Sequence, residues 1–141
     1  MNEVLQMQLS YSALTAADLL GRSRTEVFVN VEADLVVLDG DREVLREGAF
    51  PVVELASALR RWKARGVAGR GDFEFTSLSL ESRWRVRLVE ADGGWRVVDD
   101  DGFTGAVRPA GEVDAAIDDF TTRLRGDCTR LLGSWIEQYL D

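Results

Sequence analysis

Hydrophobic and polar residues alternate along the amino-terminal third of the chain, which is the period-two pattern of half-buried β-strands. The pattern is first seen over residues 5–11. It returns over residues 27–37, where the odd positions form one apolar face, and an Asp-Gly pair at 39–40 predicts a hairpin turn into a shorter strand over 42–46. Between the first two strands, capping-box spacing predicts a short helical turn over residues 15–21.

The same alternation predicts three more strands after the middle of the chain. A strand begins at residues 73–75, and its alternation changes phase at 76–77, which indicates a bulge. Residues 84–88 alternate again, and an Asp-Gly pair at 92–93 predicts a turn that returns the chain along residues 95–98.

Two segments instead repeat hydrophobic residues at helical spacing. Pro51 suits the first position of a helix, and the repeat predicts that this helix covers residues 52–65. A longer apolar stripe keeps its phase through residues 112–140 and predicts one long helix there. A break at Gly126, with Asp127 capping a second helix, is the alternative.

This order of elements predicts a single α+β domain over residues 1–141. We expect a mainly antiparallel sheet of five to six strands, covered on one face by the helices at 52–65 and 112–140. A chain of 141 residues, 45% of them hydrophobic, suits one domain with one core. The residues predicted to form that core are Leu9, Val29, Val31, Leu55, Leu59, Trp62, Phe75, Trp84, Val86, Leu88, Trp95, Ile117, Phe120, Leu124, Leu131 and Trp135.

The composition excludes several kinds of chemistry. The chain has no histidine, which excludes Ser-His and Cys-His nucleophile pairs and histidine-ligated metals. Its one cysteine, Cys128, cannot form an intramolecular disulfide, and its place on the apolar stripe of the last helix predicts an inert, buried thiol. Nucleotide-binding and hydrolase motifs are also missing. We therefore expect no enzyme activity, no cofactor and no metal site.

The chain begins without the basic and apolar regions of a signal peptide, and no stretch approaches the roughly 18 apolar residues that cross a bilayer. Together with the unpaired cysteine, this predicts a cytoplasmic protein. The tripeptide Arg70-Gly71-Asp72 matches an adhesion motif, but a chance match is common in a sequence this rich in Arg, Gly and Asp.

Acidic residues outnumber basic ones, and the formal net charge is −8. This balance argues against nucleic-acid and membrane binding and favours a basic protein partner. Seven acidic residues fall between Asp99 and Asp119, where Arg108 is the single basic residue. The residues predicted to contact the partner are Asp99, Asp100, Asp101, Asp114 and Asp118, with Phe103 as an apolar anchor. The oligomeric state stays open.

The four tryptophans support an alternative function. A sheet curved around the long helix would enclose an apolar cavity for a small molecule, lined by Trp62, Trp84, Trp95 and Trp135. The interpretation of the same four residues as the core of a small domain is the favoured one.

Three runs of the sequence resemble a family of small uncharacterised actinobacterial proteins, over roughly residues 5–100. They are Val29-Asn30-Val31-Glu32-Ala33-Asp34; Phe50-Pro51-Val52-Val53-Glu54-Leu55-Ala56 with Arg61-Trp62; and Gly71-Asp72-Phe73-Glu74-Phe75-Thr76-Ser77 with Ser79 and Glu81. The resemblance implies an ordered domain and supplies no catalytic residues. In general character the chain is also similar to immunity proteins that neutralise polymorphic toxins. We therefore expect a non-enzymatic protein-binding module, an immunity protein or antitoxin that masks a cationic partner.

Overall fold

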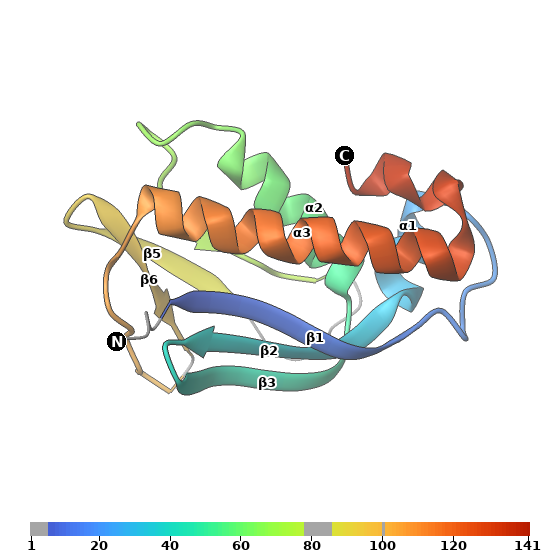
Figure 1. Cartoon of the computed structure of the whole chain (residues 1–141), viewed down its shortest axis with the longest axis horizontal. Helices are drawn as coiled ribbons and strands as arrows, with labels where there is room; N and C mark the ends of the chain where they lie inside the picture. Colours follow the sequence, from blue (N-terminus) through green and yellow to red (C-terminus); the bar gives the residue numbers. More distant parts are fainter. Residues whose placement is uncertain (1–5, 78–85, 100) are drawn as a thin grey trace.

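The computed structural model describes residues 6–77, 86–99 and 101–141. In these residues the chain forms two antiparallel sheets and three α-helices, shown in Figure 1. The elements in chain order are β1 (Met7–Thr15), α1 (Arg24–Asn30), β2 (Glu32–Asp39), β3 (Arg42–Phe50), α2 (Val52–Lys63), β4 (Phe73–Glu74), β5 (Arg87–Ala91), β6 (Gly94–Val98), β7 (Arg108–Pro109), α3 (Ala110–Leu132) and a final 3-10 helix, η1 (Ser134–Tyr139).

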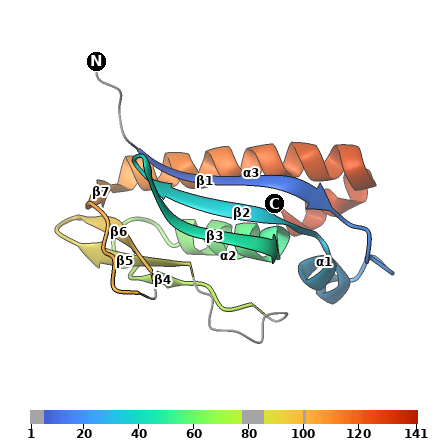
Figure 2. The same ribbon diagram turned by 90° about the horizontal axis from the view of Figure 1, so that it is seen from below.

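The α+β class is confirmed, but the prediction of one sheet with five to six strands is wrong. One sheet has three strands in the order β1-β2-β3, and a second has four in the order β4-β5-β6-β7. Helices α2 and α3 lie side by side on one face of the three-stranded sheet, as Figures 1 and 2 show. Because α2 carries the chain away from β3, β4 begins a new ladder instead of extending the first sheet.

The strand predicted over residues 27–37 is wrong in its first part, where α1 forms. The Ser23 hydroxyl accepts a hydrogen bond from the Glu26 N–H at 3.1 Å and so caps this helix. Val27 and Val31 are both fully buried, and their spacing of four fits a helix turn as well as a strand. The alternation holds only from β2 onward, where Ala33, Leu35 and Val37 are buried as predicted.

The last helix passes through Gly126 without a break but stops earlier than residue 140. Gly133 ends it with φ at +106°, a backbone conformation that favours glycine, and η1 follows. The predicted single helix over 112–140 is therefore α3 followed by η1. Leu131, in the last turn of α3, is 48% exposed, and Trp135, in η1 after the turn at Gly133, is half-buried. Neither residue therefore belongs to the fully buried core.

The structure also tests several predictions about shorter segments. The helical turn predicted over residues 15–21 is an isolated turn, in which the Leu19 N–H donates to the Ala16 carbonyl at 3.0 Å. The two-residue turn at 92–93 is confirmed, because Ala91 pairs with Gly94. Strand β7 has no counterpart among the predicted strands. The start of the strand predicted over residues 84–88 lies outside the described residues.

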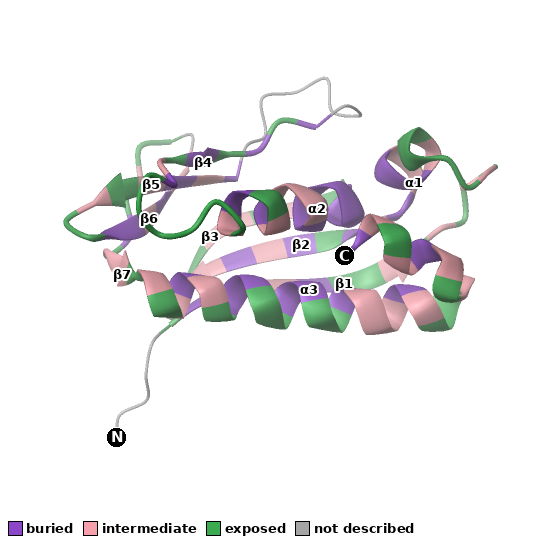
Figure 3. Cartoon of the chain, turned by 90° about the horizontal axis from the view of Figure 1, so that it is seen from above, coloured by how far each residue is buried: buried purple, intermediate pink, exposed green. Residues whose placement is uncertain are grey.

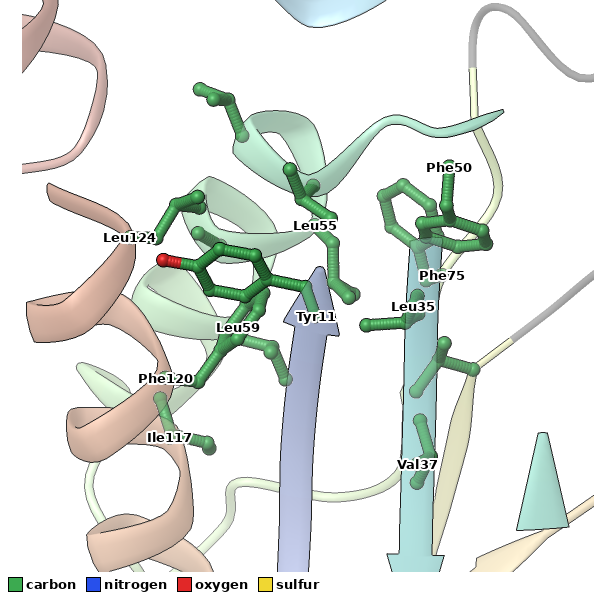
Figure 4. Packing of buried hydrophobic residues seen from close by; sticks show 14 of the residues in the cluster. Tyr11, Leu35, Val37, Phe50, Leu55, Leu59, Phe75, Ile117, Phe120 and Leu124 are labelled. Atoms are coloured by element: carbon green, nitrogen blue, oxygen red, sulfur yellow. The ribbon is translucent and has the colours of Figure 1, made fainter. Parts of the chain in front are cut away.

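The core fills the space between the helices and both sheets, and Figure 4 shows Tyr11, Leu59 and Phe120 packed together within it. Figure 3 shows that the buried residues of α2 and α3 face inward. Eleven of the predicted core residues are buried: Val31, Leu55, Leu59, Trp62, Phe75, Val86, Leu88, Trp95, Ile117, Phe120 and Leu124. Leu9 and Val29 are half-buried instead, and Trp84 lies outside the described residues.

Candidate functional site

The outer edge of β1 is the first part of the candidate site. The Gly40 N–H donates to the Gln6 carbonyl at 3.0 Å. Together with the pairing of β1 and β2, this bond shows which residues of β1 direct their main-chain groups toward β2. In an antiparallel pair, alternate residues direct their main-chain groups toward the partner strand. Gln8 and Ser10 therefore bond to β2, whereas Met7, Leu9 and Tyr11 present their N–H and C=O groups to the open side.

Helix α3 runs beside this edge (Figures 1 and 2), and two of its side chains form hydrogen bonds to the main chain of β1. The Met7 N–H donates to a Glu112 carboxylate oxygen at 3.3 Å. Arg123 donates from Nη2 to the Tyr11 carbonyl at 3.1 Å, and its guanidinium lies 4.4 Å from the centre of the Tyr11 ring. In the described residues, no side chain bonds to the main chain of Leu9, which lies between these two contacts.

A groove of about 470 Å³ lies between β1 and α3. This volume falls within the roughly 300–1,000 Å³ of typical ligand clefts. The helix contributes small residues, so its backbone leaves room beside the strand. The lining residues are Gln6, Met7, Gln8, Leu9 and Ser10 from the strand side, and Gly111, Glu112, Ala115, Ala116, Asp119 and Arg123 from the helix.

The charges of the groove are ordered along α3. Glu112 lies near Met7 and also faces Arg108, whose Nε is 3.4 Å from the Glu112 carboxylate. Asp119 is exposed, and within the described ranges no cation pairs with it. Arg123 closes the other end of the groove and is 3.8 Å from Asp127. The groove therefore combines apolar residues such as Leu9 and Ala116 with two carboxylates and one guanidinium.

Two of the predicted partner-binding residues lie on the opposite side of α3, against α2. Asp114 forms an ion pair of 2.8 Å with the buried Arg70. Asp118 forms one of 3.2 Å with Lys63 at the end of α2. The charges of Asp114 and Asp118 are thus largely balanced within the chain, and neither residue lines the groove.

The other predicted residues that the structure describes, Asp99, Asp101 and Phe103, lie in the loop after β6. The Asp99 carboxylate accepts hydrogen bonds from the N–H groups of Asp101 and Phe103, at 2.9 and 2.8 Å, and so shapes the loop. Phe103 is half-buried, and the Arg42 guanidinium lies over it, 3.8 Å from the centre of the Phe103 ring. Asp101 is exposed, and Asp100 lies outside the described residues. The structure therefore does not gather the described members of the predicted set into one patch.

The described tryptophans that were predicted to line a cavity lie in two separate places. Trp62 and Trp95 pack edge to face at 5.3 Å, and both donate from Nε1 to the Gly71 carbonyl. Trp135 instead belongs to η1, where the Arg22 guanidinium lies 4.8 Å from the centre of its ring. Trp84 lies outside the described residues.

Titratable groups next to the groove belong to its supporting structure. The Tyr11 hydroxyl donates to Asp127, and burial followed by this bond raises the pKa of Tyr11. Burial, with a smaller contribution from Asp127, raises the pKa of the Cys128 thiol to about 12. The thiol is fully buried, as predicted, and both groups stay protonated at neutral pH.

The groove residues Glu112, Asp119 and Arg123 are not among the site residues that the sequence predicts. Glu112 and Asp119 were included in the local charge, but the sequence did not show on which side of α3 each would lie. The alternation over residues 5–11 predicted β1, yet it could not show that β1 is an edge strand. That position depends on the pairing order of the whole sheet.

The fold and the groove together define a small α+β domain in which one open sheet edge lies beside an acidic helix. The chain belongs to the family described as a domain of unknown function, DUF7878, whose model matches residues 5–127. This match supports the resemblance to an uncharacterised family and extends it through most of α3. The actinobacterial distribution and the likeness to immunity proteins stay predictions. No curated protein and no solved structure matches the chain.

Two further observations concern metal binding and membrane spanning. Within residues 6–77, 86–99 and 101–141, no three His, Cys, Asp or Glu side chains come together as a group that could hold a metal ion. Among the helices of this same part of the chain, none has the length and apolar character needed to span a bilayer.

Proposed function

We propose that the chain is a non-enzymatic protein-binding module whose partner presents a cationic segment to the groove between β1 and α3. The observation that carries the proposal is the groove itself, in which an edge strand and an acidic helix face lie side by side. The groove offers apolar contact at Leu9 and Ala116 and negative charge at Glu112 and Asp119.

The charge distribution supports a cationic partner. The net charge of −8 attracts basic proteins over a distance and repels nucleic acids and anionic membranes. Close to the surface, Asp114 and Asp118 are already paired with Arg70 and Lys63, whereas Asp119 has no such pair in the described residues. The proposal therefore moves the main contact from the predicted loop to the groove face of α3.

The finer form of the proposal is an immunity protein or antitoxin of the cytoplasm. A toxin that acts on nucleic acid needs a positively charged substrate site, and an acidic module would block that site by mimicking the substrate's charge. In this role the chain needs no chemistry of its own.

The experiment starts from a random peptide library displayed on phage and selected on the purified protein. We expect the enriched peptides to be basic. Their affinity should fall as ionic strength rises from about 0.01 M to about 0.15 M, because the Debye length shrinks from roughly 30 Å to 8 Å. Asp119→Asn should weaken binding by about 1.4- to 5-fold, the equivalent of roughly 0.2–1 kcal/mol for one exposed ion pair.

Asp118→Asn is the matched control, because it removes the same charge from the neighbouring residue on the other side of α3. It should leave peptide affinity unchanged. Enriched peptides without net positive charge, or an affinity that does not change with salt, would contradict the proposal.

A further inference from the structure

We infer that the partner segment binds as an added β-strand on the outer edge of β1, in register with Met7, Leu9 and Tyr11. This inference rests on the proposed function and specifies how its site is used. An edge strand with open N–H and C=O groups is a template for an extended peptide, which gains affinity from main-chain hydrogen bonds.

The two contacts from α3 support this mode of binding. The Glu112 carboxylate accepts from the Met7 N–H, as the carbonyl of a neighbouring strand would. The Arg123 guanidinium donates to the Tyr11 carbonyl, as the N–H of a neighbouring strand would. These contacts occupy the Met7 N–H and the Tyr11 carbonyl while no strand is bound, and both would exchange for main-chain bonds when one arrives.

The dimensions of the groove fit a short extended segment. From Met7 to Tyr11 a strand rises about 13 Å at roughly 3.3 Å per residue. From Glu112 to Arg123 a helix rises about 16 Å at 1.5 Å per residue. The two α3 contacts therefore bracket a length of about five residues of added strand, and Leu9 is its centre.

Charge and packing define the occupant. One side of the added strand faces Leu9 and Ala116, which favours apolar residues at alternate positions. A basic residue fits beside Asp119 and Glu112, and an acidic residue or a terminal carboxylate fits beside Arg123. The occupant is thus an extended segment of a partner protein, with alternating apolar residues and positive charge at the Glu112 end.

A second copy of the chain fits this edge less well than a single strand. Paired strands lie about 4.8 Å apart, whereas packed helices need about 8–10 Å between their axes. Helix α3 lies beside β1 itself in Figures 1 and 2, so a second copy paired through β1 would bring its own α3 too close.

The test is amide hydrogen exchange with a selected basic peptide at saturating concentration. The amides of Leu9 and Tyr11 face the open edge, and we expect their exchange to slow at least tenfold. The amides of Gln8 and Ser10 already bond to β2 and are the internal control, with a much smaller change. Single N-methyl groups at alternate peptide positions should weaken binding by about two- to tenfold, the loss of one hydrogen bond, and those at the intervening positions should not.

The outcomes separate this inference from the proposed function. If the peptide binds with salt dependence while Leu9 exchanges at its free rate and methylation has no alternating effect, strand addition is wrong and the proposed function stands. If the complex contains two copies of the chain paired through Leu9, the occupant is wrong. If no basic peptide is enriched, the proposed function itself fails.

Discussion

Arg70 shows how little a residue's neighbours in the sequence indicate about its role. It belongs to an Arg-Gly-Asp tripeptide, yet its side chain is only 2% exposed and cannot serve adhesion in this fold. The guanidinium donates to Asp114 and to the carbonyls of Lys63 and Gly66, and it lies 4.7 Å from the Trp62 ring. These contacts join α2, α3 and the loop before β4, and no local pattern could predict them.

Arg70→Ala should destabilise the fold by roughly 3 kcal/mol, because breaking a buried ion pair costs about 3–5 kcal/mol and Asp114 keeps some contact with water. Urea unfolding followed by tryptophan fluorescence measures the change. Arg61→Ala is the control, since Arg61 is exposed and bonds only to Ser57 in the described structure. A loss below about 1 kcal/mol for Arg70→Ala would show that the cluster around Arg70 contributes little.

Cys128 was correctly predicted to be a buried thiol, because its place in the apolar stripe is a local property of the helix. Its pKa of about 12 lies above the ordinary value of 9.0. Above pH 9 the unfolded chain therefore loses a proton that the folded chain keeps, so stability must fall as pH rises from 9 toward 12.

We expect the wild-type protein to lose up to about 2 kcal/mol more than Cys128→Ala between pH 9 and pH 10.5, at 1.36 kcal/mol per pH unit. Urea titrations at the two pH values measure the difference. Tyr11, whose pKa is also raised, is present in both proteins, so the comparison isolates the thiol. Equal losses in the two proteins would mean that the thiol ionises alike in the folded and unfolded chains.

At the scale of helices and strands, hydrophobic periodicity predicted the features that depend only on the spacing of nearby residues. The stripe of α3 continued through Gly126 because the pattern kept its phase there, and the structure agrees. The end of the helix was missed because residues 133–139 keep the same apolar spacing while the backbone turns at Gly133. Likewise α1 was missed because the spacing of Val27 and Val31 suits a helix and a strand equally.

The two glycines should respond to alanine in opposite directions. Gly133→Ala should cost roughly 1–3 kcal/mol, because φ of +106° with ψ of 171° is a region essentially confined to glycine. Gly126→Ala should stabilise the protein by about 0.5–1 kcal/mol, because an interior helical glycine loses more backbone entropy than alanine. A Cβ there meets only Arg130, at 3.6 Å.

Thermal unfolding of both variants checks this pair of predictions, and each serves as the control for the other. Destabilisation by Gly126→Ala would indicate that the helix breaks at Gly126, which was the alternative left open by the sequence. An unchanged stability for Gly133→Ala would show that α3 can continue past residue 133.

At the scale of the whole molecule, the division into two sheets decides where the candidate site lies. Asp39 at the end of β2 accepts hydrogen bonds from Arg108 at 2.8 and 3.0 Å and so ties the first sheet to β7 and the start of α3. This places the acidic first half of α3 beside β1. The sequence predicted β1, α3 and the charge of α3. Whether β1 and α3 lie next to each other depends on contacts between residues that are about 70 to 105 positions apart in the chain.

The groove between β1 and α3 is the surface on which the proposed function depends. The direct measurement is the change in amide NMR shifts when a selected basic peptide is added to the isotope-labelled protein. We predict that the largest changes fall on residues 7–11 and on Glu112, Asp119 and Arg123. Largest changes at residues 99–103 and around Asp114 and Asp118 would contradict binding in the groove and favour the partner-binding residues predicted from the sequence.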